Sequence, residues 1–278
     1  MQIHVMNDSV GTAVGAWLGL VDQVCVVTGA GSGIGAETAR QFASAGARVA
    51  ILDLDGDAAR TVASEIAENN GRAVGLLVDV ASPESVSIAA RQIERELGPC
   101  RVLVNNAATR HRQPLLDLSL ESWNRVLAVN LTGALICSQA FVPQMIAAGR
   151  GGSLVHVGSI LGQHPQVDAA PYSASKAALG MLSRSLALEL GSRQIRSNLV
   201  SPGFTRTEAN EASYRDPETA AARQRLIPAG RAATPADLAH VVVFLASDRA
   251  SYINGEDIAV DGGVGSTLMS RVPRAGAQ

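Results

Sequence analysis

The segment PYSASKAALG, residues 171–180, places a tyrosine and a lysine four residues apart. On a helix, Tyr172 and Lys176 would share one face, one turn apart. Lys176 is also the only lysine among the 23 basic residues of the chain. An ammonium about 4 Å from a phenol, at an effective dielectric constant of about 20, is worth roughly 4 kcal/mol, or up to about three pKa units. The pair therefore predicts a phenol that can exchange a proton near neutral pH.

A glycine-rich segment, TGAGSGIG, follows a short apolar run at 24–28. Gly29, Gly33 and Gly35 permit positive φ angles and let the backbone approach a pyrophosphate closely. A helix that begins here would direct its N-terminal N–H groups at that anion. Such a turn can be no more than a tight connection, but its place between a strand and a helix favours nucleotide binding.

Asp53 ends the next apolar run, 20 residues after Gly33. A carboxylate at this position can bind the ribose hydroxyls of an adenosine, and it would repel a 2′-phosphate. Ser32 and Leu54 occupy the places where a basic residue could neutralise that phosphate. We therefore expect NAD rather than NADP, with capping of the next helix as the alternative role of Asp53.

The elements that must position these residues alternate along the chain. Short continuous runs rich in Val, Ile and Leu are typical of parallel strands covered on both faces. They lie at 24–28, 48–53, 73–80, 101–105, 153–159, 195–201 and 257–263. Helical patterns lie between them, one ending near Gly46 and one beginning with Ser82 as N-cap and Pro83 at the first position. The alternation predicts an α/β fold, a Rossmann-type doubly wound parallel sheet of about seven strands with helices on both faces.

One domain accounts for this pattern. We expect it to span 21–264, after an N-terminal extension at 1–20 and before a C-terminal tail at 265–278. The interval 203–235 is polar and fits neither a strand nor a helix pattern cleanly, and loops of this length are usually lids or binding segments. We therefore expect a substrate lid at about 203–230.

The bulk composition narrows the classes of function. The chain has 278 residues, 47% hydrophobic and 17% charged, with a net charge of −2 and an isoelectric point near 6.2. This charge gives no indication that the protein binds nucleic acid or an anionic membrane. No apolar run reaches the roughly 18–20 residues needed to span a bilayer, and no signal peptide is expected, so we predict a cytoplasmic protein. The three cysteines, Cys25, Cys100 and Cys137, are expected to be buried and inert, and no metal site is expected.

Taken in order, the motifs resemble those of the short-chain dehydrogenase/reductase family over residues 20–264. TGAGSGIG resembles its phosphate-binding turn, the DV pair at 79–80 its adenine contact, and NNAA at 105–108 its NNAG stretch, with Ala108 in place of the glycine. SPGFTRT, residues 201–207, resembles the segment that holds the nicotinamide. The cofactor-binding residues implied are Gly29, Ser32, Gly33, Ile34, Gly35, Asp53, Asp79, Val80, Asn106, Ala107, Tyr172, Lys176, Pro202, Gly203, Thr205 and Thr207.

The resemblance implies a catalytic set of Asn130, Ser159, Tyr172 and Lys176. Tyr172 would take the proton of an alcohol during hydride transfer, Lys176 would lower the pKa of the phenol and hold the nicotinamide ribose, and Ser159 would bind the reacting oxygen. Asn130 would anchor a water that relays protons from Lys176. Singly, each has a plain alternative: Ser159 as an N-cap, Asn130 as a buried turn residue, and Tyr172 as an ordinary residue of an amphipathic helix.

The substrate is less defined by the sequence. Candidate contacts are Arg110, His111, Arg112, Leu161, Gln163 and His164. We expect an NAD-dependent oxidoreductase that interconverts a secondary alcohol and a ketone on a sugar, polyol or similar small hydroxylated molecule. A 3-oxoacyl or other ketone reductase and a non-catalytic nucleotide-binding regulator are the alternatives. The resemblance also implies a homotetramer or homodimer, with the helices at 110–150 and 171–191 in the subunit contact.

Overall fold

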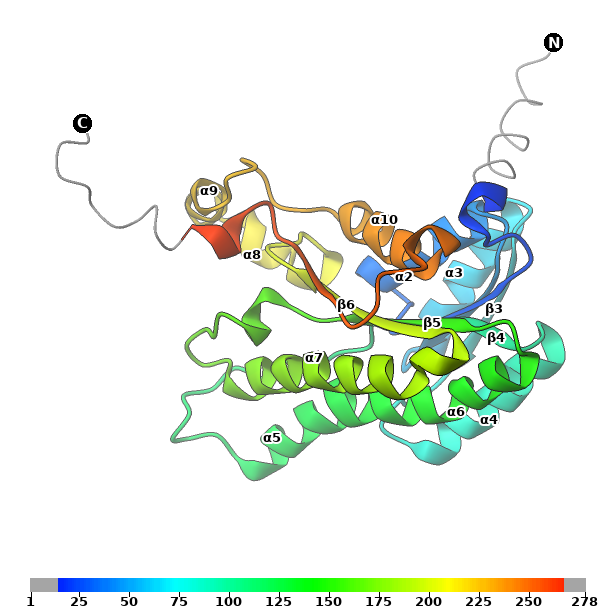
Figure 1. Cartoon of the computed structure of the whole chain (residues 1–278). Coiled ribbons are helices and arrows are strands. Elements are labelled where there is room, and N and C mark those ends of the chain that lie inside the picture. Colours follow the sequence, from blue (N-terminus) through cyan, green and yellow to red (C-terminus); the bar gives the residue numbers. More distant parts are fainter. Residues whose placement is uncertain (1–14, 268–278) are drawn as a thin grey trace, which may run out of the picture.

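A computed structural model describes residues 15–267 of the chain, and its centre is one parallel sheet in the order β3-β2-β1-β4-β5-β6-β7 (Figure 1). The strands are β1 (Val24–Thr28), β2 (Arg48–Asp53), β3 (Arg72–Leu77), β4 (Cys100–Asn105), β5 (Gly152–Val157), β6 (Ile195–Pro202) and β7 (Asp257–Val260). This order confirms the doubly wound fold. It reverses between β1 and β4, where such folds bind ligands at the carboxyl ends of the strands.

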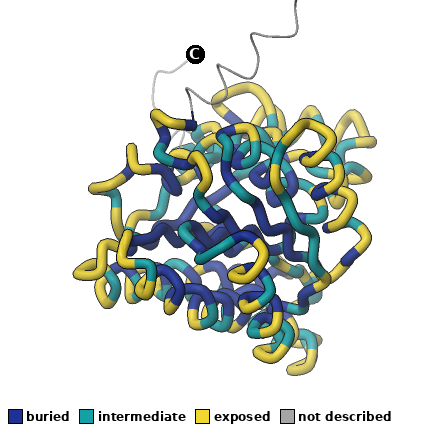
Figure 2. Tube along the Cα trace, turned by 90° about the vertical axis from the view of Figure 1, so that its right-hand side faces the viewer, coloured by how far each residue is buried: buried dark blue, intermediate teal, exposed yellow. Residues whose placement is uncertain are grey.

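Helices cover both faces of the sheet (Figure 1). The first hydrophobic core joins the sheet to α2 (Gly33–Ser44), α3 (Gly56–Glu68) and α10 (Pro235–Ala246). The second core involves α4 (Pro83–Glu96), α6 (Gly133–Ala148) and α7 (Ala170–Leu190). Figure 2 shows the central strands as the most deeply buried part of the chain, with the exposed segments around them.

The helix boundaries follow the local chemistry that the sequence indicated. Ser82 caps α4 by accepting the N–H of Ser85, and Pro83 is the first residue of that helix. α2 ends at Ser44, and Gly46 follows with a φ of 79°, a left-handed conformation that glycine adopts without strain. Capping and the left-handed glycine thus fix where two of the helices that flank the site begin and end.

Several boundaries differ from the sequence-based expectation. β3 ends at Leu77 rather than at 80, so the DV pair lies in the loop after it. Leu18 and Leu20 are buried in the first core, so the packed domain begins before residue 21. The remainder of the N-terminal extension, 1–14, and most of the C-terminal tail, 268–278, lie outside the described residues.

The polar interval 203–235 is largely helical rather than an irregular loop. It forms the 3₁₀ turn η4 (Glu208–Asn210) and the helices α8 (Ala212–Arg215) and α9 (Pro217–Leu226). Asp216 caps α9 by accepting the N–H of Thr219. The sequence pattern was weak here because no residue of α8 or α9 is buried, so no apolar stripe marks these helices.

One continuous helical segment, Leu120–Ala148, combines α5 (Leu120–Leu127), the π-helical turn η1 (Ala128–Thr132) and α6. Its length and composition would allow it to cross a membrane, which differs from the expectation that no apolar run is long enough. In this fold Cys137, Phe141 and Met145 of the segment are buried in the second core. An apolar helix that covers a sheet can have the same length and composition as a membrane-spanning helix.

The three cysteines are free and buried, as expected. Burial raises the pKa of Cys137 to about 12, and it also raises the pKa values of Cys25 and Cys100 well above the usual value of a thiol. A thiolate, the reactive form of cysteine, is therefore disfavoured at all three positions.

Candidate active site

The glycine turn connects β1 to α2 at the point where the strand order reverses. Gly29 and Gly33 have φ angles of 61° and 56°, which side chains other than glycine rarely adopt. Gly35 is required for close packing, because a Cβ atom there would lie 2.3 Å from the Gly29 carbonyl oxygen. The first turn of α2, from Gly33 through Ile34 to Gly35, presents N–H groups that lack partners within the helix.

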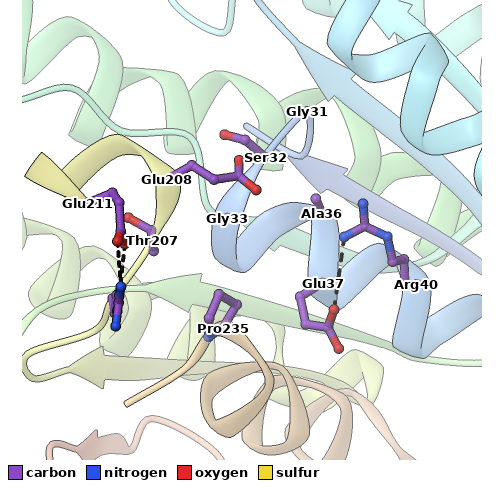
Figure 3. A pocket seen from close by; sticks show the side chains of 11 residues that line it. Gly31, Ser32, Gly33, Ala36, Glu37, Arg40, Thr207, Glu208, Glu211 and Pro235 are labelled. Carbon is purple, nitrogen blue, oxygen red and sulfur yellow. Dashed lines mark hydrogen bonds and ion pairs between the residues drawn. The ribbon is translucent and has the colours of Figure 1, made fainter. Parts of the chain in front are cut away.

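A cavity of about 450 Å³ opens beside this turn (Figure 3). Figure 3 shows the turn on one side and the segment from Thr207 to Glu211 on the other. The lining residues are Gly31, Ser32, Gly33, Ala36, Glu37, Arg40, Arg206, Thr207, Glu208, Glu211 and Pro235. Arg40 and Arg206 are paired with carboxylates, namely Glu65 and Glu211. The free N–H groups of the helix terminus and the space over them fit the pyrophosphate of a nicotinamide dinucleotide.

The Asp53 carboxylate lies at the end of β2, against the glycine turn. Its two oxygens accept the N–H of Gly31 at 2.8 Å and the N–H of Asp55 at 3.0 Å. Asp55, not Asp53, caps α3, because its side chain accepts the N–H groups of Asp57 and Ala58. The capping alternative for Asp53 is therefore wrong, and its carboxylate is held against the glycine turn, next in the chain to the exposed Leu54.

The end of β4 is fastened to the end of β1 by Thr28, whose role the sequence did not reveal. The Thr28 hydroxyl accepts the N–H groups of Asn106 at 3.0 Å and Ala107 at 3.1 Å. The Asn106 side chain donates to the carbonyl oxygens of Thr28 and Gly29 at 2.9 and 2.7 Å. The φ angle of Ala108 is not positive, so the alanine that replaces the family's glycine adopts this backbone conformation without strain.

The loop after β3 lies at the same edge of the sheet, and it contains Asp79 and Val80. The carboxylate of Asp79 accepts the N–H of Ala81, and the main-chain N–H of Asp79 donates to the Ser85 hydroxyl. Val80 is buried and lines a small cavity of about 10 Å³ together with Thr28 and Asn130. The loop therefore lies beside the strand ends that hold the glycine turn.

Tyr172 and Lys176 lie one turn apart near the start of α7, and both are buried. The Lys176 Nζ atom donates to the Val157 carbonyl oxygen at 2.7 Å and lies 5.6 Å from the centroid of the Tyr172 ring. An ammonium has three N–H donors, and only this hydrogen bond of Lys176 is found among residues 15–267. The end of β5 thus fixes the ammonium beside the phenol.

A second cation also lies against Tyr172. The Arg110 Cζ atom is 4.5 Å from the ring centroid, and its Nη2 atom donates to the phenol oxygen at 3.3 Å. Burial by itself raises the pKa of Tyr172, but Lys176, then Arg110, and to a smaller extent Ser159 lower it, so the pKa falls below its usual value of 10. Burial lowers the pKa of Lys176, which the phenol only partly offsets.

Ser159 follows β5 and faces this group of residues. Its hydroxyl accepts the N–H of Leu161 at 3.1 Å and so caps the 3₁₀ turn η2 (Ile160–Gly162). A serine hydroxyl has a further lone pair and its own proton. The capping role and a role at a reacting oxygen are therefore compatible in one side chain.

Asn130 is buried within the π-helical turn, a distortion that is common at functional sites. Its side chain exchanges two hydrogen bonds with the backbone of Thr109 and donates to Ser175 at 3.0 Å. Ser175 in turn donates to the Tyr172 carbonyl oxygen at 2.7 Å. Asn130 thus connects the loop after β4 to the helix that carries Tyr172, and Ser175 is a link that the sequence analysis missed.

The segment after β6 completes the edge next to the cavity. Gly203 packs so closely that a Cβ atom there would lie 2.7 Å from the Asp261 Cα atom. Pro202 ends β6, and Thr205 is buried. Thr207 lines the cavity and its side chain lies next to Gly33.

Some of the expected substrate contacts are linked to Tyr172 or Ser159, and the others have different neighbours. The Gln163 side chain donates to Asp257 at 2.8 Å, and His164 is exposed and adjacent to Gly265. His111 is engaged with Gln113 at 2.9 Å. Of the expected contacts, Arg110 is the one whose side chain bonds to Tyr172, and Leu161 is linked to Ser159 through its N–H.

Comparison with known proteins agrees with this geometry. A family model described as enoyl-(acyl carrier protein) reductase matches residues 29–265. D-threitol dehydrogenase of Mycolicibacterium smegmatis is 39% identical over 87% of this chain and 92% of its own. Galactitol 2-dehydrogenase of Cereibacter sphaeroides is 38% identical over 87% of this chain and 95% of its own. A crystal structure from Beutenbergia cavernae, provisionally assigned as an NAD(P)-dependent gluconate 5-dehydrogenase with NADP at low occupancy, is 40% identical with a TM-score of 0.84, covering 89% of this chain and 98% of its own.

The chain therefore belongs to the short-chain dehydrogenase/reductase family. It is an oxidoreductase that acts on a CH–OH group and uses a nicotinamide cofactor. The alternative of a non-catalytic regulator is wrong.

Proposed function

We propose that this protein is an NAD-dependent dehydrogenase that interconverts a secondary alcohol and a ketone on a sugar, polyol or similar small hydroxylated substrate. The observation that carries the proposal is the buried Tyr172 phenol, which lies against two cations, Arg110 and Lys176, beside the end of β5. Relatives named for threitol and galactitol support the substrate class. Reduction of a ketone, as in the 3-oxoacyl reductase alternative, is the same chemistry in reverse.

Each of the four residues of the catalytic set has its own role in the proposed reaction. Tyr172 takes the proton of the alcohol oxygen, and Ser159 donates a hydrogen bond to that oxygen as its charge increases. Lys176 favours the phenolate and has N–H donors left for the ribose hydroxyls, while Asn130 fixes the loop and the helix that frame the site. When bound, the nicotinamide supplies the hydride acceptor or donor.

The glycine turn, its neighbours Ser32 and Ile34, and Thr207 would hold the pyrophosphate end of the cofactor. Asp79 and Val80 would flank the adenine, and the segment from Pro202 through Gly203 and Thr205 would flank the nicotinamide. Asp53 favours NAD, because the charge of its carboxylate opposes a 2′-phosphate. We further propose a cytoplasmic homotetramer or homodimer, with a substrate lid formed by residues 203–230.

The direct test measures turnover of sugars, polyols, hydroxy acids and 3-oxoacyl thioesters with each cofactor, in both directions. Tyr172→Phe should reduce turnover of the best substrate at least 100-fold, since it removes the group that exchanges the proton. Tyr252→Phe is the matched control, because Tyr252 is fully exposed and should tolerate the same change. Appreciable turnover by Tyr172→Phe would contradict the role assigned to Tyr172.

Cofactor preference is tested separately by titration with NADH and NADPH. We expect NADH to bind more tightly, and Asp53→Asn to narrow the difference by removing the negative charge. Equal affinity of the unmodified protein for both cofactors would contradict the role of Asp53.

A further inference from the structure

Arg110 is an exposed arginine on the loop that follows β4, and its side chain lies over Tyr172. Its Nη2 atom is 3.3 Å from the phenol oxygen. Within residues 15–267, no carboxylate lies within ion-pair distance of Arg110. A guanidinium without a counter-ion therefore lies beside the atom that is proposed to exchange a proton.

The charges around this position are mainly positive. Lys176 lies 5.6 Å from the same ring, and the neighbouring Arg112 is exposed and donates to Gln166. Asp168 is the acid on the facing segment, where its main-chain oxygen accepts the N–H of Gln113, and its carboxylate is exposed. Among the residues that the structure describes, Arg110, Arg112 and Lys176 form no ion pair, so this part of the site attracts a negative charge.

We propose that Arg110 binds a carboxylate of the substrate, and that the preferred substrate is therefore a hydroxy acid rather than a neutral polyol. This inference rests on the function proposed above. A guanidinium has five N–H donors in a planar fork that fits a carboxylate in a bidentate manner. Since Tyr172 accepts one hydrogen bond from Arg110, the other donors remain for a ligand.

The distances define where the carboxylate would stand on the substrate. The reacting oxygen would lie about 2.8 Å from the phenol oxygen, and Arg110 Nη2 lies 3.3 Å from that same atom. At a tetrahedral angle the reacting oxygen and Nη2 are then about 5 Å apart, and a carboxylate oxygen lies about 2.8 Å from the nitrogen. This spacing suits a carboxylate one to three carbons from the carbinol carbon.

The test uses pairs of substrates that differ in one group. Straight-chain hydroxy acids of four to six carbons, including aldonic acids, are each compared with the alcohol made by reducing the carboxylate to CH₂OH. For at least one pair, kcat/KM for the acid should exceed that for the alcohol at least tenfold. Arg110→Gln should lower kcat/KM for that acid about 10- to 100-fold, mostly through KM, the loss expected of a hydrogen bond to a charged group. Because Arg110 also lowers the pKa of Tyr172, the paired alcohol should lose activity too, but its loss should be at least fivefold smaller than that of the acid.

Two controls separate this role from others. Arg91→Gln, on the exposed face of α4 where Arg91 donates to Ser87, should leave kcat/KM for both members of the pair unchanged. In the NADH complex of the unmodified protein, a saturated carboxylic acid should inhibit competitively, whereas its primary amide should not. This inhibition measurement needs no variant.

Each remaining outcome decides against the inference. Equal losses for acid and alcohol in Arg110→Gln would show that Arg110 acts only through Tyr172. A preference of the unmodified protein for the alcohol in every pair, or equal inhibition by acid and amide, would also overturn it while the proposed function stands. No turnover of any pair with either cofactor would overturn the proposed function and this inference together.

Discussion

Lys176 allows the electrostatic part of the site to be separated from its shape. Lys176→Met removes the charge and keeps a side chain of similar length, whereas Lys176→Arg keeps the charge and changes the shape. With the phenolate charge taken at the ring centroid, 5.6 Å from Nζ, an effective dielectric constant of about 20 gives about 3 kcal/mol. This is about 1 kcal/mol less than the roughly 4 kcal/mol expected from the sequence with an assumed separation of 4 Å.

The assay is the pH profile of kcat/KM for alcohol oxidation from pH 6 to 11. If Tyr172 is the base, the rate rises with pH through its pKa, which lies below 10 in the unmodified protein. Lys176→Met should move this rise toward alkaline pH and lower the rate about 100-fold on its acidic side, the factor to which about 3 kcal/mol corresponds. A deuterated substrate shows whether hydride transfer limits the rate.

Lys176→Arg should lose most of the activity without that alkaline shift. The Lys176 side chain is only 3% exposed and its ammonium is placed by the Val157 carbonyl oxygen, so a broad planar guanidinium does not fit the same space. An unshifted profile in Lys176→Met would refute the electrostatic reasoning. A nearly normal rate in Lys176→Arg would refute the geometric reasoning, provided that NADH binding shows both variants to be folded.

Three further predictions concern other parts of the molecule. Burial, and then the charge of Lys176, lowers the pKa of His156 to about 3. The stability that the neutral imidazole contributes is complete above the unfolded pKa of about 6.5 and is lost as the pH falls toward 3. Urea unfolding at pH 5 should therefore show that the free energy of unfolding has fallen by about 2 kcal/mol. His156→Gln should remove this dependence, the exposed His240→Gln should not, and a pH-independent difference between them would contradict the burial argument. Gly35→Ala should weaken NADH binding at least tenfold, because the new Cβ atom would overlap the Gly29 carbonyl oxygen. Gly180→Ala is the control and should bind NADH normally, since its Cβ atom would lie 3.6 Å from the Leu199 side chain. Equal affinities of the two variants would show that the glycine turn can shift. Because Lys176 is the only lysine, lysine labelled with ¹⁵N should give one side-chain ammonium resonance, which should titrate below the usual pKa as burial requires, and titration at or above that value would contradict it.

Much of the fold could be predicted from the sequence because the signals are local. Continuous runs of Val, Ile and Leu mark strands that are buried on both faces, and all seven of the predicted strands are present. Ser82 and Pro83 begin a helix through backbone geometry that needs no distant partner. By contrast, α8 and α9 lack a buried stripe, so the pattern that reveals other helices was absent from their sequence.

The sequence by itself determined the chemistry available to this protein: a glycine turn after the first strand, an acid at the end of the second, and a tyrosine one helical turn from the only lysine. These follow from residue type and short spacing, which the chain carries along its length. The tertiary structure decided which distant groups meet. Only folding brings Val157 to Lys176, Thr28 to Asn106 and Arg110 to Tyr172, across separations of 19, 78 and 62 residues. Contacts over such separations depend on strand order and loop closure, because neither spacing nor composition specifies which strand ends lie side by side.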